Sequence, residues 1–518
     1  MSRCGPGDGH GHELPYLRRV AIVRAQEHRE LADAASGGAT VELATGDGAR
    51  RLRLSFGDVV ALSADYFVAN GLDATGEGQG VAASEDLASG GLFQLAAVPG
   101  QLGTRLGTSD EIVAALRVMA ADQMTVDSRF EKGGEFAAFN FNDDDAKAVE
   151  RRVRDRFLAL GASNDDHFVD PGQRGWATEA DRPRARYGSA TLAYRHLHRR
   201  ALDEAHRQAC DGGRLEVAMA HEAAAQHHLT DAFAAGHLRT PVAEIREYWQ
   251  QRYPGFWDGL RQRVAADTAA TLKEMGGALG LLPEVFLRRR ALAAVWARTA
   301  EFPRVSLGDL LAKVFHDWDN VHGLALEGGG MVFGDGCLEQ GVTKELALGA
   351  ARAGLDDVEV AFDLGRSNGG LNGEALYQAV RSATGAESEH FVAETWIPVP
   401  SADTPAQNWR AADFESLWET PMVGSTGTTV GQAVCEALEP GEELPRRLGG
   451  LGDSLGDSIG VVAPAFVQQH LGRRAGEAYQ RGFIAKLEED PRAAVMAVID
   501  AGGGRMVVAG EPGMAGPG

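Results

Sequence analysis

Helical periodicity is strongest between residues 185 and 300, where apolar side chains return every three or four positions. This spacing gathers them on one face of an α-helix, and few segments in this part of the chain alternate as a strand would. The pattern predicts helices at about 187–210, 214–235, 241–252, 256–278 and 284–300, and a further one that Ser306 opens and that runs through Phe315. We therefore expect a mainly α fold of helices packed on helices.

The N-terminal part combines helices with one small β-hairpin. Val41 and Leu43 alternate with polar residues before the turn Gly46-Asp47-Gly48, and Leu52 and Leu54 alternate after it. Such alternation around turn residues is typical of two paired strands. Helices are predicted at 17–36, at 56–68, at 108–122 with Ser109 as its N-cap, and at 143–160.

These patterns suggest a mostly α domain over residues 1–345 and a second, mostly helical region over 346–505. The loop at 397–409 interrupts the second region, and a Gly/Ser-rich stretch follows at 448–460. The Gly-rich end, 506–518, is predicted to be a disordered tail.

Composition excludes several classes of protein. The net charge of −22 disfavours a nonspecific binder of nucleic acid and a purely electrostatic hold on anionic lipid. Four widely spaced cysteines form neither a zinc ribbon nor a disulfide framework. The first residues contain no apolar stretch of signal-peptide length, and no run of about 18 apolar residues occurs anywhere. We expect a protein that stays in the cytoplasm or is exported without a classical signal, for example as a secreted effector.

The most informative motif is His227-x3-Asp231-x5-His237, inside a segment that otherwise has a helical pattern. A separation of four places His227 and Asp231 on one helical face, where an imidazole and a carboxylate suit zinc or a similar metal. On a straight helix, His237 would lie about 9 Å further along and about 240° around. Either the helix ends, with Gly236 as a stop, or His237 serves a second metal. An ordinary helix with ion-paired histidines is the alternative.

Three further segments concentrate the side chains that bind metals. Each alone could be a capped turn, because Asp and Asn are common cap residues. Together they hold more His and Asp than one metal needs, which favours a site with several ions. The residues are Asp58 and Asp65 in FGDVVALSADYF, Asp165, Asp166, His167 and Asp170 in NDDHFVDP, and His316, Asp317, Asp319, Asn320 and His322 in FHDWDNVHG.

The loop DHFVDP, followed after about 60 residues by HHLTDAFAAGH, resembles the zinc-dependent phospholipase C family. This family shares its helical-bundle fold with the single-strand-specific zinc nucleases. The segments LSFGDVVALSADYF and HDWDNVHG are most similar to a longer bacterial and fungal branch that lacks a lipid-binding β-sandwich. The resemblance covers roughly residues 1–345 and is specific only at the two motifs.

The resemblance implies a ligand set for two or three zinc ions. His167, His227 and Asp231 would hold one zinc together with Asp65, preferred over Asp58, and Asp231 would bridge to a second. His237 would join His316 at the remaining zinc. There Asp319 is preferred over Asn320, which stands where the family has an acid. The family's N-terminal Trp and His ligands have no match here beyond His10 and His12, so His12 is a candidate for a third zinc.

The implied activity is hydrolysis of phosphatidylcholine-like lipids at a membrane surface, giving diacylglycerol and a phosphorylated headgroup. Asp65 is the candidate general base that orients the attacking water, and Asp231 is the second catalytic candidate. A zinc nuclease acting on single-stranded nucleic acid is an alternative, which the absence of a basic, aromatic stripe disfavours. A non-catalytic interaction protein that keeps the fold is another.

Overall fold

The computed structural model describes residues 25–44, 51–64, 66, 94–95, 105–106, 108–122, 127–137, 139, 149–150, 153, 167–169, 189–276, 281, 283–299, 305–334, 336–386, 390–425, 427–438 and 474–506. The fold is mainly α, as the sequence predicts, with a small antiparallel hairpin near the N-terminus. The chain divides into two compact units. Unit 1 contains residues 1–21, 242–318 and 406–518, and unit 2 contains 22–241 and 319–405. The boundary predicted at 345 instead falls inside a helix, α15 (Thr343–Ser367).

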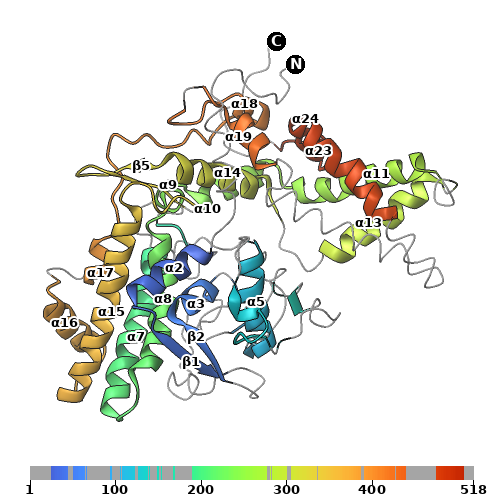
Figure 1. Ribbon diagram of the computed structural model, residues 1–518. Coiled ribbons are helices and arrows are strands. Elements are labelled where there is room, and N and C mark those ends of the chain that lie inside the picture. Colours follow the sequence, from blue (N-terminus) through green and yellow to red (C-terminus); the bar gives the residue numbers. More distant parts are fainter. Residues whose placement is uncertain are drawn as a thin grey trace. The chain divides into compact units, whose positions relative to one another are not determined.

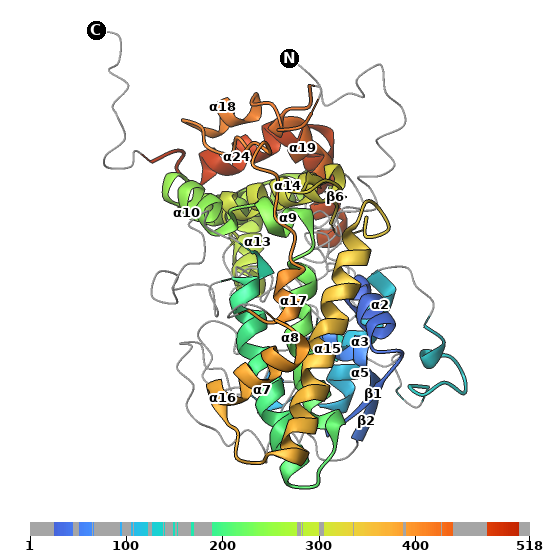
Figure 2. The same ribbon diagram turned by 90° about the vertical axis from the view of Figure 1, so that its left-hand side faces the viewer.

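Unit 2 is built around three long helices, α7 (Ala190–Cys210), α8 (Leu215–Asp231) and α15, which pack side by side (Figures 1 and 2). Every residue of α8 from Ala220 to Asp231 is buried. This is why α8 has no polar face, and its run of alanines allows neighbouring helices to approach closely. The last turns of α8, which carry the His/Asp motif, therefore lie in the interior of the unit.

The N-terminal elements of unit 2 cover α8. The predicted hairpin is confirmed: β1 (Thr40–Ala44) pairs with β2 (Arg51–Ser55), and Val41 lies opposite Leu54 and Leu43 opposite Leu52. Buried side chains of the hairpin, α3 and α5 form one core cluster with Ala220, Ala223 and Ala224 of α8. The helices concerned are α2 (Ala25–Ala35), α3 (Phe56–Leu62) and α5 (Ser109–Asp122).

The remaining elements of unit 2 are short or peripheral. They are β3 (Gln94–Leu95), β4 (Arg105–Leu106), the 3-10 turn η1 (Ser128–Phe130), α9 (Ala235–Arg239), β5 (Leu324–Ala325), β6 (Met331–Val332), α16 (Gly373–Thr384) and α17 (Val392–Thr395).

Two helix ends in unit 2 differ from the positions predicted from the sequence. The N-cap of α5 is Thr108 rather than Ser109, because the Thr108 hydroxyl accepts from the Glu111 amide. The predicted helix 214–235 ends at Asp231.

Unit 1 is also helical. Its elements are α10 (Val242–Arg252), α11 (Phe256–Glu274), α13 (Glu284–Thr299), most of α14 (Leu307–His322), α18 (Phe414–Trp418), α19 (Val430–Ala437), the π-helical turn η4 (Gln480–Ile484), α23 (Ala485–Glu489) and α24 (Pro491–Ala501). Ser306 begins α14, as predicted, through a capping box with Asp309. The helix continues beyond Phe315, so the HDWDN run is helical.

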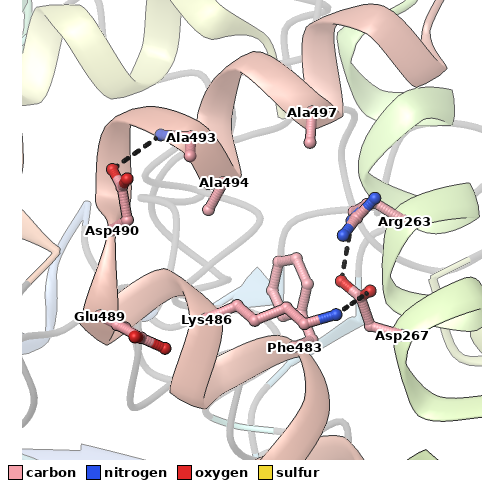
Figure 3. A pocket seen from close by; sticks show the side chains of 9 residues that line it. All are labelled: Arg263, Asp267, Phe483, Lys486, Glu489, Asp490, Ala493, Ala494 and Ala497. Carbon is pink, nitrogen blue, oxygen red and sulfur yellow. Dashed lines mark hydrogen bonds and ion pairs between the residues drawn. The ribbon is translucent and has the colours of Figure 1, made fainter. Parts of the chain in front are cut away.

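The C-terminal helices of unit 1 pack closely on α11. A Cβ at Gly259 would lie 2.1 Å from the Val498 carbonyl oxygen, so only glycine permits this contact. Asp267 of α11 accepts from Arg263 at 2.8 Å and from Lys486 of α23 at 2.7 Å, beside a shallow pocket (Figure 3). Among the described residues, no helix is long and apolar enough to cross a bilayer.

Candidate metal centre

The carboxylate of Asp231, in the last turn of α8, lies among four imidazoles. Its Oδ2 is 2.8 Å from Nδ1 of His167 and 3.5 Å from Nε2 of His227. Its Oδ1 is 3.4 Å from Nε2 of His28 and 3.4 Å from Nδ1 of His237. All five side chains are buried. The four histidines come from α2, residues 167–169, α8 and α9, so distant segments of the sequence converge on one carboxylate.

A break in the helix brings His237 to this carboxylate. α8 ends at Asp231, the chain turns through 232–234, and the short helix α9 then begins at Ala235. The His237 Nδ1–H donates to the carbonyl oxygen of His167 at 2.9 Å, and the Val169 amide donates back to the His237 carbonyl. The straight-helix geometry that would separate His237 from Asp231 therefore does not occur. The break comes before Gly236, the stop considered from the sequence.

Hydrogen bonds fix the tautomer of His227. Its Nδ1 lies 2.9 Å from the carbonyl oxygen of Val60 on α3, which can only accept, so Nδ1 carries the proton. Nε2 is then a bare lone pair directed toward Asp231. Among the described residues, neither His227 Nε2 nor Asp231 Oδ2 has a hydrogen-bond partner, and the contact between His167 and Asp231 is an ion-pair distance.

His28 is held in the same way by Thr230. The Thr230 hydroxyl lies 2.8 Å and 2.9 Å from the carbonyl oxygens of Gln226 and His227, to which it donates. It therefore accepts from Nδ1 of His28, at 2.6 Å, and leaves Nε2 of His28 unprotonated toward Asp231. Two lone pairs and a carboxylate that face one another in the interior repel unless a cation lies between them. Backbone and hydroxyl partners of this kind are typical of metal-binding histidines.

The electrostatics of the cluster keep His28 neutral and the carboxylate of Asp231 charged. Burial, reinforced by the neighbouring His227, lowers the pKa of His28 from 6.5 to about 3. Burial alone would raise the pKa of Asp231, but the surrounding imidazoles, His167 first among them, hold it well below its usual range. Neutral imidazoles and an ionised carboxylate are the protonation states that bind a metal ion.

Two groups of side chains in the described part of the chain could each hold a metal ion. One is His28, His227 and Asp231, and the other is His167, His228 and Asp231. Within each group the ligand atoms lie within 4.8 Å of one another. Asp231 belongs to both groups, and adjacent His227 and His228 direct their rings into different groups. The nitrogen and oxygen donors present are those that zinc and similar divalent metals use, so the residues fit such an ion.

The structure thus brings together four of the residues singled out from the sequence: His167, His227, Asp231 and His237. Sequence reasoning missed His28 and did not choose His228 as a ligand. The available signal for His28 was its position on the buried face of α2, one turn before Leu31 and Ala32. A histidine on an apolar helix face is too common to mark a site without knowledge of its neighbours.

The two predicted acidic ligands Asp58 and Asp319 are instead partners of arginines. Asp58 forms the capping box of α3 with Ser55, and its carboxylate accepts from Arg29 and Arg129. Both oxygens of Asp319 pair with the guanidinium of Arg239. A carboxylate already neutralised by a guanidinium is a poor ligand for a metal, because it would have to give up that ion pair.

The other predicted ligands have different positions. The side-chain oxygen of Asn320 accepts from the Gly236 amide at 2.6 Å, which holds the start of α9. His316 belongs to unit 1, where its Nδ1 lies 2.9 Å from Asp317, so a metal shared with His237 stays a prediction. Asp65, His10 and His12 lie outside the described residues.

No protein-family model matches this sequence, and neither the curated proteins nor the solved structures contain a match. The resemblance to the zinc phospholipases C therefore rests on the motifs and on the side-chain cluster they form.

Proposed function

We propose that this protein is a zinc-dependent phosphodiester hydrolase, most specifically a phospholipase C that acts on phosphatidylcholine-like lipids. The observation that carries the proposal is the carboxylate of Asp231, which two buried groups of imidazoles share. A carboxylate common to two ligand groups is suited to bridge two ions, and paired ions are a recurrent arrangement in enzymes that cleave phosphodiesters.

Bound zinc would supply a water of lowered pKa and would polarise the phosphodiester. The residues of the chain prepare the site for this chemistry. His28 and His227 are locked in one tautomer by Thr230 and by the Val60 carbonyl, so their lone pairs need no reorientation. Asp231 stays ionised and places negative charge between the two ligand groups.

The ligand side chains of the site are nearly or completely buried. His227 is completely buried, whereas His28, His167 and His237 retain 8%, 6% and 7% of their accessible surface. This exclusion of water strengthens the electrostatic interactions that the ligands make.

Asp65 remains the candidate general base in this proposal, because α3 is tied to the site helix. The carbonyl oxygen of Val60 holds His227, and the chain leaves α3 through Ser63 and Ala64. Ala64 has a φ of 65°, a left-handed conformation that costs a non-glycine residue about 1–3 kcal/mol. Such strain is often found beside functional residues, and it directly precedes Asp65.

Parallel assays test the proposal. Phosphocholine release from phosphatidylcholine vesicles and cleavage of single-stranded DNA would be measured with and without chelator. The wild-type protein, Asp231→Asn and the exposed control Asp211→Asn would be compared. We expect chelator-sensitive lipid hydrolysis, a loss of at least ~100-fold in Asp231→Asn, and no change in Asp211→Asn.

Three outcomes would contradict parts of the proposal. Chelator-sensitive cleavage of DNA without lipid turnover would replace the phospholipase with a nuclease. Full activity of Asp231→Asn would remove the proposed site. A metal content near zero together with no activity on either substrate would favour an interaction protein that keeps the fold.

A further inference from the structure

Helix α13 of unit 1 has one buried and one unusually apolar exposed face. Leu287, Ala291 and Val295, spaced by four, are buried on the side that packs against α11. Other positions on the helix expose several large apolar residues of the kind that soluble proteins normally cover, although the Trp296 ring also stacks on the guanidinium of Arg261 from α11, 4.1 Å from the ring centroid. Their exposed fractions are 88% for Leu281 in the preceding turn, 65% for Val285, 45% for Phe286 and 46% for Trp296.

The same helix concentrates positive charge in a strongly acidic protein. α13 contains Arg288, Arg289, Arg290 and Arg298 against the single acid Glu284, which gives 4 − 1 = +3, whereas the whole chain carries −22. The three consecutive arginines are exposed and form no ion pair or hydrogen bond with any described residue. The guanidinium of Arg290 lies over the Phe286 ring, 5.5 Å from its centroid. These charges are therefore available to an external anion.

The apolar and basic side chains share the exposed part of the helix. At about 100° per residue, Val285, Trp296 and Phe286 lie within an arc of about 100°. Arg288 and Arg290 border this arc on its two sides, and Arg289 lies within it. Apolar and aromatic residues flanked by basic ones are characteristic of helices that lie in a lipid–water interface. There the aliphatic stems of arginine cover apolar surface while the guanidinium reaches the headgroups.

We propose that this α13 face, defined as Leu281, Val285, Phe286, Arg288, Arg289, Arg290 and Trp296, docks on the surface of an anionic phospholipid membrane. The apolar side chains enter the boundary of the acyl chains, and the arginines pair with lipid phosphates. A lipid surface is favoured over an acidic protein groove because Leu281, in the turn before α13, is 88% exposed. A side chain that stands out this far can enter the acyl-chain boundary of a membrane. The biological role of this docking surface rests on the proposed function. Binding of the surface to lipid, however, requires no hydrolysis.

Vesicle binding of the full-length protein tests the surface. Vesicles of phosphatidylcholine alone, and of phosphatidylcholine mixed with phosphatidylglycerol, would be sedimented with the protein in chelator, at low and high salt. We expect salt-sensitive binding to the mixed vesicles. The variant Arg288→Gln/Arg289→Gln/Arg290→Gln should weaken it about 100-fold, because each basic residue near an anionic surface contributes about fivefold.

Matched variants separate this face from general electrostatics. The control Arg410→Gln/Arg481→Gln/Arg492→Gln removes three accessible arginines elsewhere in unit 1 and should bind as the wild type does. Leu281→Ser/Phe286→Ser should weaken binding and leave its salt dependence in place. On binding, the emission of Trp296 should shift to shorter wavelength, and Trp296→Phe should remove that shift.

Several results would overturn the docking surface. The wild-type protein could fail to bind mixed vesicles, or the control variant could lose as much binding as the α13 variant. The third result is a wild-type protein that is a dimer and an α13 variant that is a monomer. Hydrolysis of a short-chain, monomeric phosphatidylcholine keeps the two proposals apart. If the α13 variant hydrolyses it normally but the wild type binds no vesicles, only the docking surface fails. If vesicles bind and no phosphatidylcholine is hydrolysed, only the proposed function fails.

Discussion

Unit 2 contains two buried clusters of histidine and carboxylate that share helix α8 yet have opposite electrostatics. The metal centre combines one carboxylate, Asp231, with at least four imidazoles. The second cluster, which we call the core triad, combines the single imidazole of His198 with two carboxylates, Glu222 and Asp357. All three residues of the core triad are fully buried.

The ratio of imidazoles to carboxylates decides which cation each cluster suits. Burial and the neighbouring His227 lower the pKa of His28 at the metal centre to about 3. Burial opposes protonation of His198 too, but Glu222 and Asp357 overcome it and raise its pKa to about 10. A proton on His198 therefore balances the charge of the core triad. In the metal centre, by contrast, the Nε2 atoms of His28 and His227 are unprotonated and face the charged carboxylate of Asp231. The same residue types thus form a structural ion pair in one place and a candidate ligand set in the other.

The geometry agrees with this distinction. His198 lies between its partners, with Nδ1 2.6 Å from Glu222 and Nε2 3.4 Å from Asp357, so it joins α7, α8 and α15. A Cβ at Gly354 would lie 2.6 Å from Glu222 Oε1, which shows how tightly α15 closes over the triad. Among the described residues, the groups whose ligand atoms all lie within 4.8 Å of one another do not include the core triad.

The largest effect on stability should come from His198→Leu. Removal of the imidazolium leaves two carboxylates unpaired in the core, and loss of one partner of a buried ion pair costs about 3–5 kcal/mol of unfolding free energy. Urea unfolding of the variant measures this loss. The control His390→Gln, at a half-exposed histidine of the same unit, should change stability by less than about 1 kcal/mol. Equal stability of the two variants would contradict the role of the triad.

The proton on His198 should contribute part of that energy in a pH-dependent way. Its pKa is about 10 in the folded protein and 6.5 as the ordinary value, so the folded state holds the proton more tightly. The stabilisation is fully present below about pH 6.5, decreases as the pH rises, and is lost above about pH 10. The difference in unfolding free energy between wild type and His198→Leu should therefore shrink over this window. A constant difference would show that His198 is neutral in the fold.

A smaller effect on stability, but a specific effect on metal, should follow His28→Gln. This change removes a nitrogen from one of the two ligand groups and should lower zinc affinity at least ~100-fold in competition with a chelating dye. Glu30→Gln, an exposed change on the same helix, serves as the control. Unchanged zinc affinity in His28→Gln would exclude His28 from the metal centre.

The smallest effect should come from Thr230→Val, which keeps the shape of the side chain but removes the acceptor for His28 Nδ1. The imidazole then loses its fixed tautomer, and zinc affinity should fall about 10-fold, as is typical when an outer partner of a ligand is removed. The same dye competition measures it. A loss as large as that in His28→Gln would indicate that Thr230 does more than orient the ring.

Local patterns made much of unit 2 predictable. The alternation of Val41 and Leu43 with Leu52 and Leu54 predicted the hairpin, because successive side chains in a strand point to opposite faces. The spacing of four between His227 and Asp231 predicted that they share one face of a helix, and on α8 their side chains do lie together. His237 lies beside Asp231, and only the turn at 232–234 shows how it reaches that carboxylate.

The rest depends on contacts between distant segments. His28 precedes His227 by 199 positions, and no local pattern relates them. Asp58 resembled a ligand because its arginine partners, Arg29 and Arg129, are brought to it only by folding. The predicted boundary at 345 assumed consecutive domains, whereas each unit is assembled from separated stretches of the chain.

The central claim is that Asp231, and not the core triad, is the cation-binding centre. Anomalous diffraction at the zinc edge from zinc-loaded crystals tests it most directly. The account predicts two peaks that share Asp231, one beside His28 and His227 and the other beside His167 and His228, at about 2.0–2.2 Å from their ligands. An absence of peaks at Asp231, or a peak at His198, would contradict it.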